Sequence, residues 1–135
     1  SFTSECLINL IKSKKRNIKA LLLDQSIIAG LGNIYVDESL WKSKIHPNSL
    51  SHKIPKKQLE NLHQNIRTIL ANAIEQNGTT IIDFSVNGES GKYANELKIY
   101  GKNNSKCICC NQKIKKIRVA GRGTYICLEC QKKYK

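Results

Sequence analysis

Apolar residues in the first half of the chain recur at spacings of three and four, which is the period of an amphipathic helix. The clearest stripe lies in the segment that Pro55 opens and Gly78 closes, with polar residues on the opposite face. Shorter helices are expected over residues 3–13, 18–23 and 33–43, so residues 1–78 are predicted to be a helical domain. The apolar members of the long stripe are Leu59, Leu62, Ile66, Ile69, Leu70, Ala73 and Ile74.

Local signals place the ends of these helices. Thr3 is suited to be an N-cap, because a threonine hydroxyl accepts a hydrogen bond from a free N–H of the first turn. Gly30 and Gly32 predict a tight turn before the third helix. Pro47 stops that helix, because proline disfavours a helical conformation in the residue before it. His63, in the long helix, is expected to be a solvated side chain and not a ligand.

The second half of the chain loses the helical period. Residues 79–93 are rich in Thr, Asn, Ser and Gly, a composition typical of a long loop that is either functional or disordered. From Leu97 on, apolar and basic residues alternate around the cysteines, which predicts short strands in hairpins. One hairpin would pair residues 117–119 with residues 124–126 across Gly121, Arg122 and Gly123.

Four cysteines have the spacing of a metal site. Cys107 and Cys110 form one C-x2-C pair, Cys127 and Cys130 form another, and sixteen residues separate the pairs. Two turns of this kind present four thiolates to one Zn²⁺ in a tetrahedron. The sequence therefore predicts one structural zinc ion, with no open position for water and hence no Lewis-acid role.

Two cysteines lie outside this pattern. Cys109 is a rival to Cys110 for the metal, and the spacing favours Cys110. Cys6 lies in an apolar helix, where a free thiol is expected to act as a small core residue. A redox or disulfide site is the alternative for the cluster, although a secreted disulfide scaffold would spread its cysteines through the chain. The predicted fold class is mainly α with a small β zinc ribbon.

The charge of the chain narrows the choice of partner. Twenty-three Lys and Arg against ten Asp and Glu give a formal net charge of +13, which fits a polyanion better than a small neutral substrate. Nucleic acid is the leading partner and an anionic membrane surface is the second. The alternative to both is a lysine-rich surface that serves only solubility. No apolar run reaches the ~20 residues of a membrane span and no signal sequence is found, so a soluble intracellular protein is expected.

The run from Gly30 to Tyr35 is a second candidate for binding. It lies at the turn between two predicted helices, where free backbone N–H groups at a helix N-terminus can hold a phosphate. Such a turn also occurs simply as a connection between two helices, without a bound ligand. Both interpretations stay open on these residues alone.

In combination, these motifs resemble the formamidopyrimidine-DNA glycosylase family. Their order and spacing match over essentially the whole chain, and the run Gly-Leu-Gly-Asn-Ile-Tyr is closer to this family than to endonuclease VIII, which shares the architecture. The matching residues are Leu22 to Gln25, Ile28 to Tyr35, Asp37 and Glu38, Ile45 to Pro47, Gly78 to Thr80, Asp83 and Phe84, Tyr100 and Gly101, Gly121 to Thr124, the two cysteine pairs and Gln131.

The resemblance implies roles for individual residues. Asn33, Tyr100 and Arg122 fall where the family contacts the phosphates that flank a damaged nucleotide. The loop after Gly78 falls where the family covers the flipped base, and its candidates are Thr79, Thr80, Ile81, Ile82, Asp83 and Phe84. The implied division is a helix-two-turn-helix domain (1–78), a base-capping loop and linker (79–97) and a zinc finger (98–135).

The resemblance also implies the activity of the parent enzyme. That activity is excision of oxidised purines, such as 8-oxoguanine and formamidopyrimidines, from double-stranded DNA, followed by cleavage of the abasic site by β,δ-elimination. The family's nucleophile is an amino-terminal proline, whereas this chain contains only Pro47 and Pro55. We therefore assign no catalytic residue and expect a monomeric, cytoplasmic, nucleoid-associated bacterial fragment that binds damaged or abasic DNA without catalysis.

Two other functions remain open at this point. A free-standing zinc-ribbon protein of transcription or ribosome assembly would explain the charge and the cysteines. It would not explain the run from Gly30 to Tyr35 together with Arg122. An inhibitor that caps lesions without repairing them is the other alternative.

Overall fold

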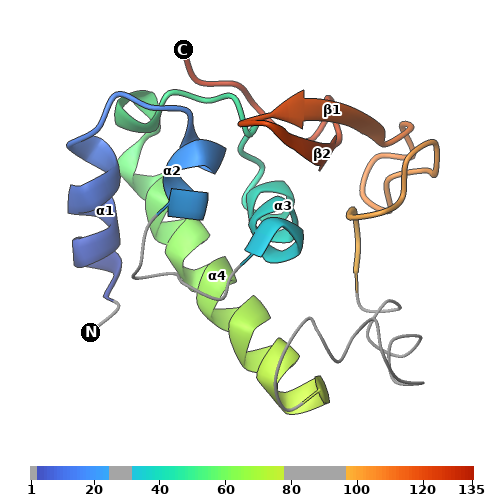
Figure 1. Cartoon of the computed structure of the whole chain (residues 1–135), viewed down its shortest axis with the longest axis horizontal. Coiled ribbons are helices and arrows are strands. Elements are labelled where there is room, and N and C mark those ends of the chain that lie inside the picture. The colour runs from blue at the N-terminus through green and yellow to red at the C-terminus, as the bar shows by residue number, and fades with distance from the viewer. Residues whose placement is uncertain (1–2, 25–31, 78–96) are drawn as a thin grey trace.

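The computed structural model describes residues 3–24, 32–77 and 97–135 (Figure 1). Its helices are α1 (Ser4–Lys12), α2 (Ile18–Asp24), α3 (Gly32–Lys42), the short 3-10 helix η2 (Ser51–Lys53) and α4 (Lys56–Asn77). An antiparallel hairpin follows, made of β1 (Lys115–Val119) and β2 (Arg122–Ile126). The longest helix, α4, packs against α1 and α3, and the hairpin lies over α3. The predicted class, mainly α with a small β ribbon, is confirmed.

The helices α1 to α4 begin and end within one residue of the expected positions, whereas η2 was not expected. Thr3 is the N-cap of α1, and its Oγ1 accepts a hydrogen bond from the backbone N–H of Cys6 at 3.1 Å. None of the helices in the described part of the chain combines the length and the apolar character needed to cross a membrane.

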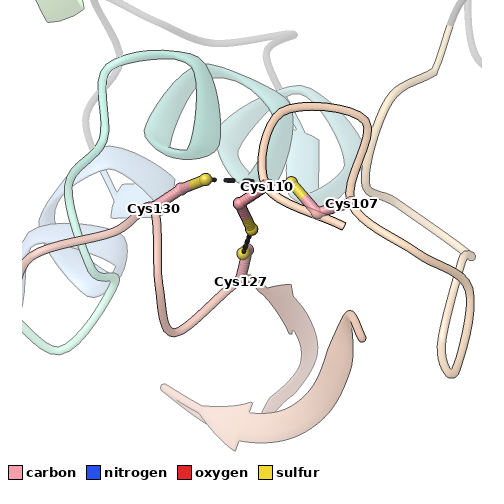
Figure 2. Close-up of side chains that lie close together, drawn as sticks. All are labelled: Cys107, Cys110, Cys127 and Cys130. Carbon is pink, nitrogen blue, oxygen red and sulfur yellow. Dashed lines mark hydrogen bonds between the residues drawn. The ribbon is translucent and has the colours of Figure 1, made fainter. Parts of the chain in front are cut away.

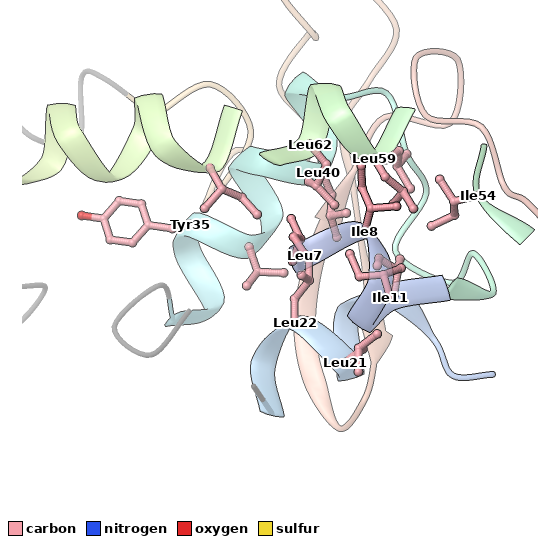
Figure 3. Packing of buried hydrophobic residues seen from close by; sticks show 14 of the residues in the cluster. Leu7, Ile8, Ile11, Leu21, Leu22, Tyr35, Leu40, Ile54, Leu59 and Leu62 are labelled. Carbon is pink, nitrogen blue, oxygen red and sulfur yellow. The ribbon is translucent and has the colours of Figure 1, made fainter. Parts of the chain in front are cut away.

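The apolar stripes of α1, α2, α3 and α4 meet in one core (Figure 3). Burial of these side chains is the main source of stability for the helical half, because apolar surface leaves water on folding. A second, smaller cluster lies beneath the hairpin and contains Trp41, Ile99, Ile114, Cys107 and Cys127. The main core includes Leu7, Ile8, Ile11, Leu21, Leu22, Leu40, Ile54, Leu59 and Leu62.

Two expectations about single residues in the helices are wrong. Cys6 is exposed, because it lies beside the buried stripe of α1 that runs through Leu7 and Ile11. His63 is buried, because it lies four residues after Leu59 and therefore on the packed side of α4.

The hairpin turn is shorter than the expected turn over Gly121 to Gly123 and begins one residue earlier. Ala120 and Gly121 form a two-residue turn, and both have positive φ angles, 54° and 76°. Such a turn matches the twist of the two strands, and glycine adopts it without strain. Arg122 and Gly123, which were expected in the turn, are the first two residues of β2.

The segments on either side of the hairpin are irregular. Residues 97–114 form turns and one isolated bridge between Lys106 and Lys113, where short strands were expected. The C-terminal residues return to the helical half, where the carbonyl of Lys132 accepts from the N–H of His46 at 2.8 Å. The carbonyl of Tyr134 accepts from the N–H of Leu50 at 2.7 Å. The segment that follows Cys130 is thus joined to the helical half.

Candidate nucleic-acid interface and metal centre

Two turns bring four cysteines together (Figure 2). The Sγ atoms of Cys107, Cys110, Cys127 and Cys130 all lie within 4.8 Å of one another. The Cys110 and Cys127 sulfurs are 3.3 Å apart, and the Cys107 and Cys130 sulfurs are 3.8 Å apart. A tetrahedral site with metal–sulfur bonds of ~2.3 Å has sulfur–sulfur separations of roughly 3.8 Å. These thiols could therefore hold one metal ion with four sulfur ligands.

Burial opposes ionisation of the thiols in this cluster. Burial raises the pKa of the Cys127 thiol and of the Cys130 thiol. Burial also opposes ionisation of Cys107, but hydrogen bonds from its neighbours, first among them the backbone of Cys109, together outweigh it and lower the pKa of Cys107 to about 7. A bound cation would allow the four thiols to lose their protons together. Cys109 itself is exposed and lies outside the cluster.

Gln131 fastens the cysteine cluster to the helical half. Its buried side chain accepts a hydrogen bond from the N–H of Cys127 at 2.8 Å through Oε1. Its Nε2 donates to the carbonyl of Ile45 at 2.9 Å. A single amide thus joins the second cysteine turn to the segment that follows α3.

The three residues expected to contact phosphates come together in space. Asn33 Nδ2 donates to the Tyr100 hydroxyl at 3.2 Å and to the carbonyl of Gly123 at 3.1 Å. Gly123 directly follows Arg122 in β2. The ring of Tyr100 also packs edge-on against the ring of Tyr125, with centroids 4.8 Å apart. The start of α3, the turn after Leu97 and the start of β2 therefore meet at one place.

This meeting point offers hydrogen-bond donors to an anion. Arg122 is exposed, and no carboxylate within the described ranges forms an ion pair with it. The Tyr100 hydroxyl accepts from Asn33 and so keeps its own hydrogen for a ligand. Both hydrogens of the Asn33 amide are engaged within the chain, so its side chain orients the Tyr100 hydroxyl and the start of β2. A guanidinium, a hydroxyl and a helix N-terminus together suit a phosphate.

A buried ion pair, which sequence reasoning missed, lies behind these residues. Lys19 Nζ donates to Asp37 Oδ1 at 2.7 Å and to Thr124 Oγ1 at 2.6 Å, and the side chains of Lys19 and Asp37 are fully buried. Asp37 Oδ2 accepts from the N–H of Tyr125 at 3.0 Å. Burial lowers the pKa of Lys19 and raises the pKa of Asp37 to about 6, and the attraction between the two charges opposes both shifts. The pair links α2, α3 and β2.

Glu38 was also missed as a structural residue. Its carboxylate accepts hydrogen bonds from three consecutive backbone N–H groups, those of Lys98 at 2.9 Å, Ile99 at 2.8 Å and Tyr100 at 2.7 Å. A signal was present in the sequence. Asp37 and Glu38 are adjacent acids in a strongly basic chain, and they follow directly after the run that ends at Tyr35 and Val36.

The candidates for the base pocket, residues 79–84, lie outside the described residues, as do Gly30 and Leu31 of the turn before α3. Their expected roles therefore remain predictions.

Comparison with known proteins identifies the family. Residues 1–85 match the family model described as the formamidopyrimidine-DNA glycosylase H2TH domain. The chain belongs to this family. The formamidopyrimidine-DNA glycosylase of Lactobacillus helveticus is 50% identical over 135 residues, which cover 99% of this chain and 49% of that protein. The Lactobacillus acidophilus glycosylase is 49% identical over the same coverage. The chain thus spans about half the length of the curated relatives it matches.

Solved structures of the family have the same fold. The Lactococcus lactis formamidopyrimidine-DNA glycosylase bound to DNA containing FAPY-dG aligns with a TM-score of 0.87 at 42% identity, covering 98% of this chain and 48% of that chain. The complex of the same enzyme with DNA containing an abasic site gives the same values. A MutM complex with DNA containing carbocyclic 8-oxo-G aligns with a TM-score of 0.86. The family resemblance drawn from the sequence is confirmed.

Proposed function

We propose that this chain is the DNA-binding half of a bifunctional base-excision-repair glycosylase. The whole enzyme would remove oxidised purines from double-stranded DNA in the bacterial cytoplasm and cleave the abasic site by β,δ-elimination. Support comes from the relatives, which are named formamidopyrimidine-DNA glycosylases, and from the solved neighbours, whose DNA carries FAPY-dG, carbocyclic 8-oxo-G or an abasic site.

The observation that carries this proposal is the convergence of Asn33, Tyr100 and Arg122. Their segments are far apart in the sequence, yet the Asn33 amide bonds directly to the Tyr100 hydroxyl and to the residue after Arg122. DNA phosphates bind guanidinium groups, hydroxyls and helix N-termini, and such contacts fix the register of the protein on the duplex. The other basic side chains would add affinity that falls with salt.

The metal in this proposal is one structural zinc ion held by Cys107, Cys110, Cys127 and Cys130. Zinc supplies folding free energy to small domains of this kind and holds four sulfur ligands without an open position. It would keep the hairpin rigid, so that the first residue of β2 stays next to α3. Residues 79–84 are proposed to cover the flipped base, within the linker of residues 79–97.

A binding titration tests the proposal. The zinc-loaded chain would be titrated against two duplexes of one sequence, one of which contains a stable abasic-site analogue. We expect tighter binding to the abasic duplex, since a kinked or unpaired site is easier to deform. Arg122→Ala should weaken this binding roughly tenfold or more, because a charge-assisted hydrogen bond is worth about 1.5–3 kcal/mol.

Arg67→Ala is the matched control. Arg67 is an exposed arginine of α4, a helix that packs against α1 and α3, and its removal costs the same single charge. A free-standing zinc-ribbon protein would show equal affinity for the two duplexes. Equal effects of the two arginine substitutions would contradict the proposed phosphate contact.

A further inference from the structure

The proposed phosphate contacts lie on three separate segments. Asn33 is in the first turn of α3, Tyr100 is in the turn after Leu97, and Arg122 begins β2. Hydrogen bonds weaken steeply when distance or angle departs from the optimum, so the segments must be held at fixed separations. The residues that hold the second and third segments against α3 therefore set the geometry of the proposed phosphate contacts.

Glu38 holds the segment that carries Tyr100. The three consecutive N–H groups of residues 98–100 converge on its carboxylate at 2.7–2.9 Å. Glu38 is only 6% exposed, and no cation within the described ranges pairs with it. Its charge is therefore balanced mainly by the backbone of the segment that it holds, and the Tyr100 side chain starts from a fixed point.

Asp37 holds the hairpin that carries Arg122. One of its oxygens accepts from the N–H of Tyr125, and the other accepts from Lys19. Lys19 continues to the hydroxyl of Thr124, which in turn donates to the carbonyl of Arg122 at 2.9 Å. A chain of short contacts thus runs from α3 to the backbone of Arg122.

The two acids are consecutive, and successive side chains on a helix point ~100° apart. One can therefore hold the segment after Leu97 while its neighbour holds the hairpin. We propose that Asp37 and Glu38 are positioning residues for DNA binding, Glu38 acting through Tyr100 and Asp37 acting through Arg122. This inference rests on the proposed function, because it assumes that Tyr100 and Arg122 meet phosphates.

The sign of the charge makes the inference testable. A carboxylate near a phosphate repels it, so removal of an acid from a DNA-binding surface ordinarily tightens binding. Removal of an acid that holds a DNA-contacting residue in place has the opposite effect and weakens binding. Glu38→Gln replaces one acceptor oxygen with an amide that faces backbone N–H groups, and the segment should loosen.

The experiment is a double-mutant cycle on affinity for the abasic-analogue duplex. Tyr100→Phe and Glu38→Gln are each expected to weaken binding by roughly tenfold. The double variant should bind the duplex about as tightly as the single variant that binds it less tightly. The reason is that Tyr100 cannot contribute to binding once its segment has moved. Glu60→Gln, which removes an exposed acid from α4, is the matched control and should leave affinity unchanged or slightly higher.

Hydrogen exchange of the free chain supplies a readout that needs no DNA. Glu38→Gln should speed exchange at the amides of residues 98–100 and leave residues 123–125 protected. Asp37→Asn should do the reverse, while zinc content and helical circular dichroism stay as in the unmodified chain. If Asp37→Asn does not fold, Thr124→Val replaces it, since it removes only the hydroxyl that Lys19 and the Arg122 carbonyl share.

The outcomes separate this inference from the proposed function. Unchanged affinity in both Tyr100→Phe and Arg122→Ala contradicts the proposed function and the inference together. Weakened binding in those two variants, with Glu38→Gln no different from Glu60→Gln, contradicts the inference alone. If the losses of affinity in Glu38→Gln and Tyr100→Phe multiply in the double variant, the two residues act independently, and this outcome also overturns the role of Glu38. The role of Asp37 is tested with Asp37→Asn or, in its place, Thr124→Val. Unchanged hydrogen exchange at residues 123–125 overturns this role. Losses of DNA affinity that multiply when either substitution is combined with Arg122→Ala also overturn it.

Discussion

Lys19 shows how little a single residue type says about its environment. In the sequence it is one of twenty-three basic residues, each of which reads as part of a solvated surface. In the fold it is fully buried, because the short helix α2 is covered by α3 on one side and by the hairpin on another. The partner that makes burial tolerable, Asp37, lies eighteen residues away. No local pattern reports a contact of that kind.

The buried pair predicts a large cost when one partner is removed. Lys19→Met keeps most of the aliphatic volume and leaves the carboxylate of Asp37 buried without its cation. We expect the zinc-loaded chain to lose about 3–5 kcal/mol of its free energy of unfolding, measured by urea denaturation followed by circular dichroism. The double variant Lys19→Met with Asp37→Asn should regain much of that loss, because it has no uncompensated charge and keeps an acceptor for Tyr125. A double variant less stable than Lys19→Met would contradict this account.

At the scale of elements, local sequence predicts what local interactions determine. The helices follow from stripes of apolar residues and from caps such as Thr3, so their bounds were predicted to within one residue. The two cysteine pairs were predicted because a tetrahedral site needs that spacing. The alternation in residues 97–114 predicts strands, whereas the structure has turns there, because their shape depends on Glu38 and on the cysteine cluster.

The finger is also an element whose stability can be separated from that of the helices. Its cluster around Trp41, Cys107 and Cys127 is distinct from the main core. Cys110→Ser should therefore lose zinc and disorder the hairpin while most of the helical signal remains. Zinc content by mass spectrometry and the fluorescence of Trp41, the single tryptophan, measure the two effects.

Cys109→Ser is the control for this substitution, because Cys109 is exposed and outside the four-sulfur cluster. We expect it to keep one zinc ion per chain. Loss of zinc in Cys109→Ser with retention in Cys110→Ser would show that the rival thiol is the ligand.

For the whole molecule, buried polar links join the helical core to the finger, alongside the apolar contacts of Trp41 and Leu97. Asp37, Glu38 and Gln131 supply those links from the helices and from the finger. Hydrophobic patterns predicted each part but not the joint, because buried polar contacts between distant segments leave no periodic trace. The net charge of +13 was a better guide at this scale, since attraction to a polyanion sums over the whole surface.

At the scale of the whole molecule, the amines of the chain also determine whether it can react with DNA by itself. The family resemblance places the nucleophile, an amino-terminal proline, in another domain. The nitrogens of Pro47 and Pro55 are amide nitrogens within the chain, which are not nucleophilic, and the amine of Lys19 is buried in an ion pair. We therefore expect the 135-residue chain to bind an abasic duplex and to form no specific covalent adduct on borohydride reduction. Gel electrophoresis of the reduced mixture, with the Lactococcus lactis enzyme as positive control, measures this. Exposed lysines are expected to form covalent adducts with the DNA only slowly, and these adducts should not depend on Arg122. Fast adduct formation that Arg122→Ala abolishes would show that the chain carries a nucleophile of its own.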